Sequence, residues 1–161
     1  MSESFRVSME SPQSGWMSLS LKAGEESLVM AASYAPYDSL RDLIEGLSAL
    51  LNGSEAVTVK WNCEPEEFDF KLTAQGGVNG VEFKAIRYAN HRRRQRDSRL
   101  VFSLRGSKLD VCLPFWTALR DLQRRISTDV FASNWKREFP QRELQQLTRL
   151  IRSRKRQERL N

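Results

Sequence analysis

PYDSLRDLIEGLSALLNG, residues 36–53, decides the fold class of this chain, because the spacing of the apolar residues changes there. Leucine and isoleucine recur every three or four residues, which places them on one face of an amphipathic helix. Asp38 or Ser39 can cap the start of this helix, and Gly53 follows its end. The apolar face is formed by Leu40, Leu43, Ile44, Leu47, Leu50 and Leu51.

Apolar and polar residues alternate on both sides of this helix, which is typical of half-buried β-strands. Before it, WMSLSLKAG (16–24) and SLVMAASYA (27–35) predict a hairpin. After it, four closely spaced runs predict an antiparallel meander. These runs cover residues 56–62, 67–74, 81–89 and 98–106.

Helical spacing returns near residue 108 and continues, after a junction at 129–140, into a last helix. Pro114 suits the first turn of a helix, so we expect the first of these helices to begin near it. The apolar stripe of the last helix fades beyond Ile151, where we expect the end to fray. The predicted fold is α+β: an antiparallel sheet of about six strands in the order ββα–ββββ–αα, with helices packed on one face.

Charge divides the chain into regions. Residues 1–134 carry 17 basic and 17 acidic residues, whereas residues 135–161 carry 9 and 3, which accounts for the net charge of +6. We therefore predict a flexible leader (1–14), a single α+β domain (15–134) and a basic C-terminal helix or extension (135–161). The polar N-terminus resembles no secretory signal, and no apolar run approaches the roughly 20 residues that span a bilayer. The expected location is cytoplasmic, without a membrane partner.

The residues that usually carry catalysis are scarce. Cys63 and Cys112 are predicted to be free thiols in or beside the core. The single histidine, His91, has no serine, cysteine or carboxylate arranged around it as a triad. Metal-ligand spacings and phosphate-binding glycine loops are absent from the sequence. We therefore predict no catalytic residue, no metal and no cofactor, and an enzyme is the least favoured class.

Two charged segments are the candidate partner-binding regions. NHRRRQRDSRL (90–100) is predicted to be the exposed tip of a hairpin, and its candidate residues are Arg92, Arg93, Arg94, Arg96 and Arg99. CEPEEFDF (63–70) is acidic, and its alternation predicts that the acids line the solvated face of a strand. The candidates there are Glu64, Glu66, Glu67 and Asp69.

The stretch YDSLRDLIEGLSALLNGSEAVTVKWNCEPEEFDFKL (37–72) resembles small bacterial α+β proteins, some of which are encoded beside polymorphic toxins as immunity proteins. The similar portion covers roughly residues 16–130, and the basic segment 135–161 departs from the pattern. The resemblance implies a non-enzymatic cytoplasmic protein that covers a cognate toxin. Either the acidic strand would meet a basic toxin surface, or the arginine hairpin would enter an acidic cleft.

The alternative function is nucleic-acid binding through the arginine hairpin and the basic C-terminal helix, because arginine forks suit phosphates. Against it, the tryptophans lie in strand and helix patterns and are not interleaved with the arginines as a stacking platform. The sequence leaves open the identity of the partner, which charged segment is the interface, and the oligomeric state.

Overall fold

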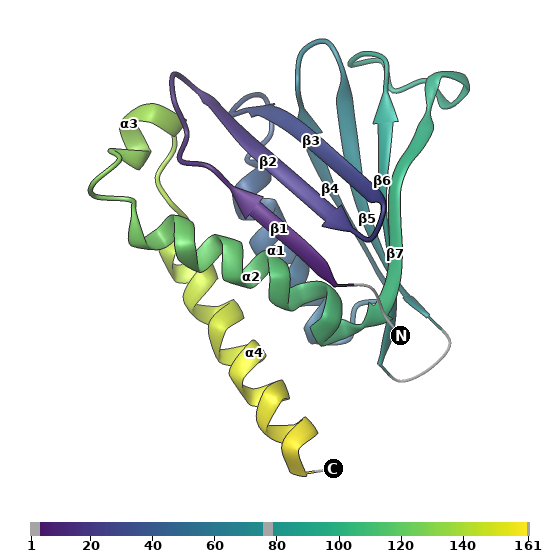
Figure 1. Cartoon of the computed structure of the whole chain (residues 1–161). Coiled ribbons are helices and arrows are strands. Elements are labelled where there is room, and N and C mark those ends of the chain that lie inside the picture. The colour runs from purple at the N-terminus through teal and green to yellow at the C-terminus, as the bar shows by residue number, and fades with distance from the viewer. Residues whose placement is uncertain (1–3, 76–78, 161) are drawn as a thin grey trace.

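The computed structural model describes residues 4–75 and 79–160 and has an α+β architecture with two antiparallel sheets (Figure 1). The first sheet has the strand order β1-β2-β3, with β1 at Phe5–Met9, β2 at Trp16–Ala23 and β3 at Glu26–Ser33. The second has the order β4-β5-β6-β7, with β4 at Ala56–Asn62, β5 at Glu67–Gln75, β6 at Gly80–Tyr88 and β7 at Arg99–Ser107. The helices are α1 (Ser39–Leu51), η1 (Gln95–Asp97), α2 (Lys108–Arg124), α3 (Phe131–Trp135) and α4 (Gln141–Leu160).

The predicted single sheet of about six strands was wrong, because the strands divide into two sheets and the order includes an additional first strand. The expected flexible leader contains β1, which pairs antiparallel with β2. Phe5 and Met9 bury their side chains, and Val7 pairs with Leu21. With β1 added, the first hairpin becomes a three-stranded sheet that is separate from the meander.

The boundaries of the later helices also differ from expectation. The helix α2 begins at Lys108, and Pro114 lies inside it. A capping box sets this start: the backbone N–H of Asp110 donates to Ser107 Oγ at 3.0 Å, and the N–H of Ser107 donates to Asp110 Oδ2 at 3.3 Å. The junction contains α3, and α4 stays helical to Leu160 instead of fraying after Ile151.

The core lies between the two sheets and the helices. Phenylalanine rings from β1, β5, β6, β7 and α2 meet there. Phe5 of β1 lies 5.5 Å from Phe115 of α2, and Phe83 of β6 lies 5.6 Å from Phe115, measured between ring centroids. Gly46 brings α1 close to β4, because a Cβ at this position would lie 2.6 Å from Cγ1 of Val57. The predicted apolar face of α1 is confirmed, since all six of its residues are buried.

The last helix packs one face against the domain and leaves the other open. Leu144, Leu147 and Ile151 are buried on the packed side, and the C-terminal half of α4 projects beyond the rest of the molecule (Figure 1). None of the described helices is long and apolar enough to cross a membrane.

Candidate functional site

Arg93 lies in the loop between β6 and β7 but points back onto β5 instead of into solvent. Its Nε donates to Glu67 Oε1 at 2.7 Å, its Nη1 donates to Asp69 Oδ1, and its Nη2 donates to the Phe68 carbonyl at 3.4 Å. Only 15% of the Arg93 side chain is exposed. The prediction that all five hairpin arginines lie on an exposed tip was therefore wrong for Arg93.

Two tyrosines hold the Arg93 guanidinium between their rings. Its central carbon lies 5.6 Å from the ring centroid of Tyr37 and 5.1 Å from that of Tyr88. The Tyr37 hydroxyl donates to Glu67 at 2.8 Å, and the Tyr88 hydroxyl donates to Asp69 at 3.2 Å. These five residues, here called the Arg93 cluster, join the loop to β5, β6 and the segment before α1.

Burial and the two carboxylates shift the pKa values of both tyrosines and of the arginine in the Arg93 cluster. Burial raises the pKa of Tyr37, and its hydrogen bond to Glu67 raises it further. Burial likewise raises the pKa of Tyr88, together with the charge of Asp69. Burial alone would lower the pKa of Arg93, but the hydrogen bonds to Asp69 and Glu67 outweigh it, and the net change is upward. Arg93 therefore stays charged and both phenols stay neutral at neutral pH.

The acidic candidates do not form one surface. Glu67 and Asp69 are only 2% and 6% exposed, so the predicted solvated face of β5 was wrong at these positions. The expectation failed because the loop carrying Arg93, which alternation within one strand cannot show, covers that face. Glu66 forms an ion pair with Arg87, and Glu64 is exposed.

The other four hairpin arginines are exposed, as predicted, and are here called the loop arginines: Arg92, Arg94, Arg96 and Arg99. None of them forms an ion pair with a residue in 4–75 or 79–160. A hollow of about 330 Å³ lies at the base of the loop, with Arg96, Arg99 and one acid, Asp97, in its lining. Leu100, beside it, is 53% exposed. This end of the molecule therefore presents exposed arginines that form no ion pair, together with an exposed apolar side chain.

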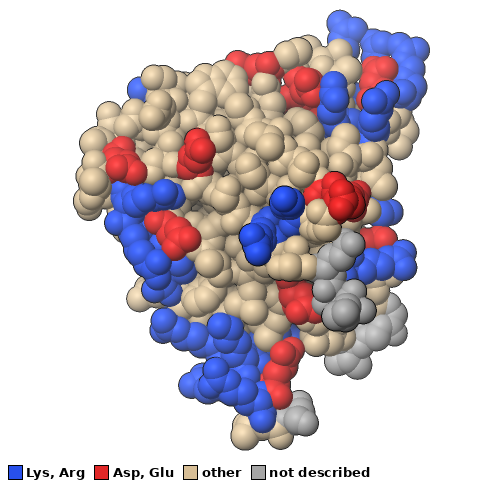
Figure 2. Space-filling view, in the orientation of Figure 1, with Lys and Arg blue, Asp and Glu red and all other residues tan. Residues whose placement is uncertain are grey.

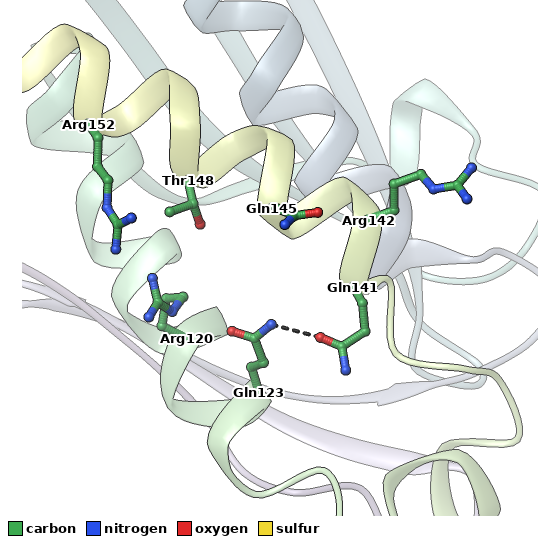
Figure 3. A pocket seen from close by; sticks show the side chains of 7 residues that line it. All are labelled: Arg120, Gln123, Gln141, Arg142, Gln145, Thr148 and Arg152. Carbon is green, nitrogen blue, oxygen red and sulfur yellow. Dashed lines mark hydrogen bonds between the residues drawn. The ribbon is translucent and has the colours of Figure 1, made fainter.

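A second basic surface lies at the other end of the face shown in Figure 2, over α2 and α4. A groove of about 520 Å³ separates these two helices (Figure 3). The sequence predicted a basic C-terminal helix as a possible binding surface, but it did not single out Arg120. The one indication of Arg120 in the sequence is its place on the polar side of a predicted helix. The groove is lined by Arg120, Gln123, Gln141, Arg142, Gln145, Thr148 and Arg152.

The two thiols are free, as predicted, with Cys112 buried and Cys63 half-buried. Burial raises the pKa of Cys112 to about 12. Burial also raises the pKa of Cys63 to about 12, and the charges of Glu66 and Glu67 act in the same direction. Neither thiol is a thiolate at neutral pH, which removes its strength as a nucleophile. Across the described residues, no three histidine, cysteine or acidic side chains gather as metal ligands.

No protein-family model matches the chain, and comparisons with curated proteins and with solved structures find no similar protein.

Proposed function

We propose that this protein is a non-enzymatic binding module that inserts the loop arginines into an acidic surface of a partner protein. The role that fits best is immunity-like neutralisation of a bacterial toxin by direct binding. The observation that carries this proposal is the attachment of the loop: Arg93 is held by Glu67 and Asp69 at the centre of the arginine-rich segment.

Attachment through Arg93 prepares the neighbouring arginines for binding. The loop backbone is also closed locally, since the N–H of Arg93 donates to the Asn90 carbonyl at 3.1 Å and the N–H of Arg92 donates to Asn90 Oδ1 at 3.0 Å. A loop that is ordered before binding loses less conformational entropy on association. Arginine forks recognise carboxylates in pairs, so the partner surface should be rich in aspartate and glutamate.

Of the two interface alternatives from the sequence, the structure favours the arginine loop. Glu67 and Asp69 are buried against Arg93, and Glu66 is paired with Arg87, so little free acidic charge remains to meet a basic partner. The loop and the first two residues of β7 keep four exposed cations and the exposed Leu100. Unpaired charges on a projecting loop steer association with an oppositely charged partner.

The test is capture from nuclease-treated lysate of the source organism, with the whole chain as bait. The bait variant replaces the four loop arginines with serine and keeps Arg93, so that the loop stays attached. A control bait removes the same charge from α4 by replacing Arg149, Arg152, Arg156 and Arg159 with serine.

We expect one discrete protein to be retained by the wild type and by the α4 control, and lost by the loop variant. Expressed alone, that protein should arrest growth, and co-expression of this chain should restore it. Retention by the loop variant would exclude the loop as the interface. A retained protein that does not impair growth would exclude the immunity role.

A further inference from the structure

Cations gather without a counter-charge in the groove between α2 and α4. Arg120 on α2 and Arg152 on α4 point towards one another across it (Figure 3). The lining contains no carboxylate, and neither arginine forms an ion pair within the described part of the chain. Like charges that face one another repel, and an anion placed between them would relieve the repulsion.

Arg120 is fixed in place but incompletely hydrogen-bonded. Its guanidinium lies 5.4 Å from the ring centroid of Trp116, whose Nε1 donates to Thr148 Oγ1 at 2.9 Å. Nε of Arg120 is buried and finds no acceptor among the residues of 4–75 and 79–160. Buried polar atoms nearly always have a partner. Because Nε is buried, an anion in the groove would meet the outer guanidinium nitrogens of Arg120, which point towards Arg152 (Figure 3).

The positive charge continues past the groove along α4. Basic side chains recur at three-, four- and seven-residue spacings along the solvent-facing side of the helix, from Arg142 to Arg159. Arg152 lies at the groove beside α2, whereas Arg149 lies on the side of α1, in a hollow with Ser48 and Asn52. At 1.5 Å per residue this row is roughly 25 Å long. We call it the basic face of α4: Arg142, Arg149, Arg152, Lys155, Arg156 and Arg159.

We propose that the groove and the basic face of α4 bind the phosphodiester backbone of a nucleic acid, with one phosphate held between Arg120 and Arg152. A row of cations of this length matches a chain of regularly spaced phosphates, whereas a small anion would occupy the groove alone. The lining is polar and basic, as in nucleic-acid interfaces, and lacks the apolar centre of a protein interface. This site is remote from the loop arginines and does not depend on the function proposed for them.

The experiment is fluorescence anisotropy with a labelled single strand of about 20 nucleotides and with the corresponding duplex, over a series of sodium chloride concentrations. The groove variant is R120Q/R152Q. The matched control is R92Q/R96Q, which removes the same charge from the loop. Arg152→Gln alone, on the exposed side of α4, provides a variant that cannot disturb the packing of Trp116.

We expect the wild type to bind at least one of the two probes, more weakly as salt increases. The groove variant should lose about tenfold or more in affinity, since hydrogen bonds to charged groups are individually strong. Each lost contact to a single strand should flatten the plot of log affinity against log salt by about 0.7. Arg152→Gln should flatten the plot by about 0.7 and the groove variant by about twice as much, and the loop control should lose less than about threefold in affinity.

Three outcomes would overturn the proposal. The first is no binding of either probe at low salt. The second is an equal loss in the groove variant and the loop control, which would mean that net charge alone attracts the probe. The third is displacement of the labelled strand by polyglutamate as effectively as by unlabelled strand, which would assign the groove to acidic polypeptides. None of these results bears on capture of a protein by the loop arginines.

Discussion

The loop between β6 and β7 and the helix α4 are the two arginine-rich regions of the molecule, and one arginine in each, Arg93 and Arg152, shows how the fold treats them differently. In the loop, Arg93 is buried against Glu67 and Asp69, so its charge serves attachment. Along α4, Arg152 faces Arg120 across a groove whose lining contains no acid. Local composition makes the two regions look alike. What distinguishes them is whether the fold brings a carboxylate within reach, and this decides which arginines can meet another molecule.

The largest expected effect comes from removing the buried cation. Arg93→Ala should lower the free energy of unfolding by about 3–5 kcal/mol, because Glu67 and Asp69 would remain buried without compensation. Urea unfolding measures this loss, and Arg92→Ala is the matched control in the same loop. A loss below about 1 kcal/mol would show that solvent reaches the two carboxylates, and the contrast with α4 would disappear.

Removing the three charges of the Arg93 cluster together should recover part of the free energy of unfolding that R93A loses. The variant R93M/E67Q/D69N contains no buried charge at the site, so we expect it to be about 2 kcal/mol more stable than R93A. The same urea titration compares the two variants directly. If the triple variant were no more stable than R93A, the uncompensated charges of Glu67 and Asp69 would not be the source of the loss in R93A.

Alkaline pH should act on the Arg93 cluster through its two phenols. Tyr37 and Tyr88 have folded-state pKa values above the ordinary value of 10.0, so their stabilising effect is complete below pH 10 and is lost as the pH rises through the folded values. Urea midpoints should therefore fall above pH 10. The fall should be smaller in Y37F/Y88F, whereas R120Q/R152Q should follow the wild type. An unchanged fall in Y37F/Y88F would assign the alkaline effect to other groups, such as Cys63 and Cys112.

The smallest expected effect concerns the exposed cations. Replacing the four loop arginines with serine should change the free energy of unfolding by no more than about 0.5 kcal/mol, because none of them forms an ion pair with a described residue. Thermal unfolding at neutral pH is the measurement. A drop of many degrees in the melting temperature would show that other loop residues besides Arg93 stabilise the fold. The loop arginines would then not differ from Arg93 in their role.

Short-range patterns explain which parts of the fold were predictable. The helix at 39–51 has six apolar residues at helical spacing, and the strands of the meander alternate over most of their length, so each element could be recognised within its own segment. The first strand was missed because only Phe5, Val7 and Met9 alternate within an otherwise polar segment. The division into two sheets depends on which strands pair across the chain, and periodicity carries no information about that.

The candidate site was predicted as a list of residues and not as an arrangement. Arg93 and Glu67 were both selected, but as members of two separate surfaces, and the structure joins them by a hydrogen bond of 2.7 Å. Arg120 was not selected, because its significance arises only when α4 places Arg152 opposite it. Amphipathic spacing shows that a helix has a polar side but not what lies across from that side.

The amino-acid sequence by itself determined the α+β class, the helix at 39–51, the free state of both cysteines and the excess of positive charge in residues 135–161. These properties follow from residue type and local spacing. The tertiary structure decided which charges are neutralised inside the protein and which remain outside it. Electrostatic pairing depends on distance and burial, and residues 26 positions apart, such as Glu67 and Arg93, come together only when the chain has folded.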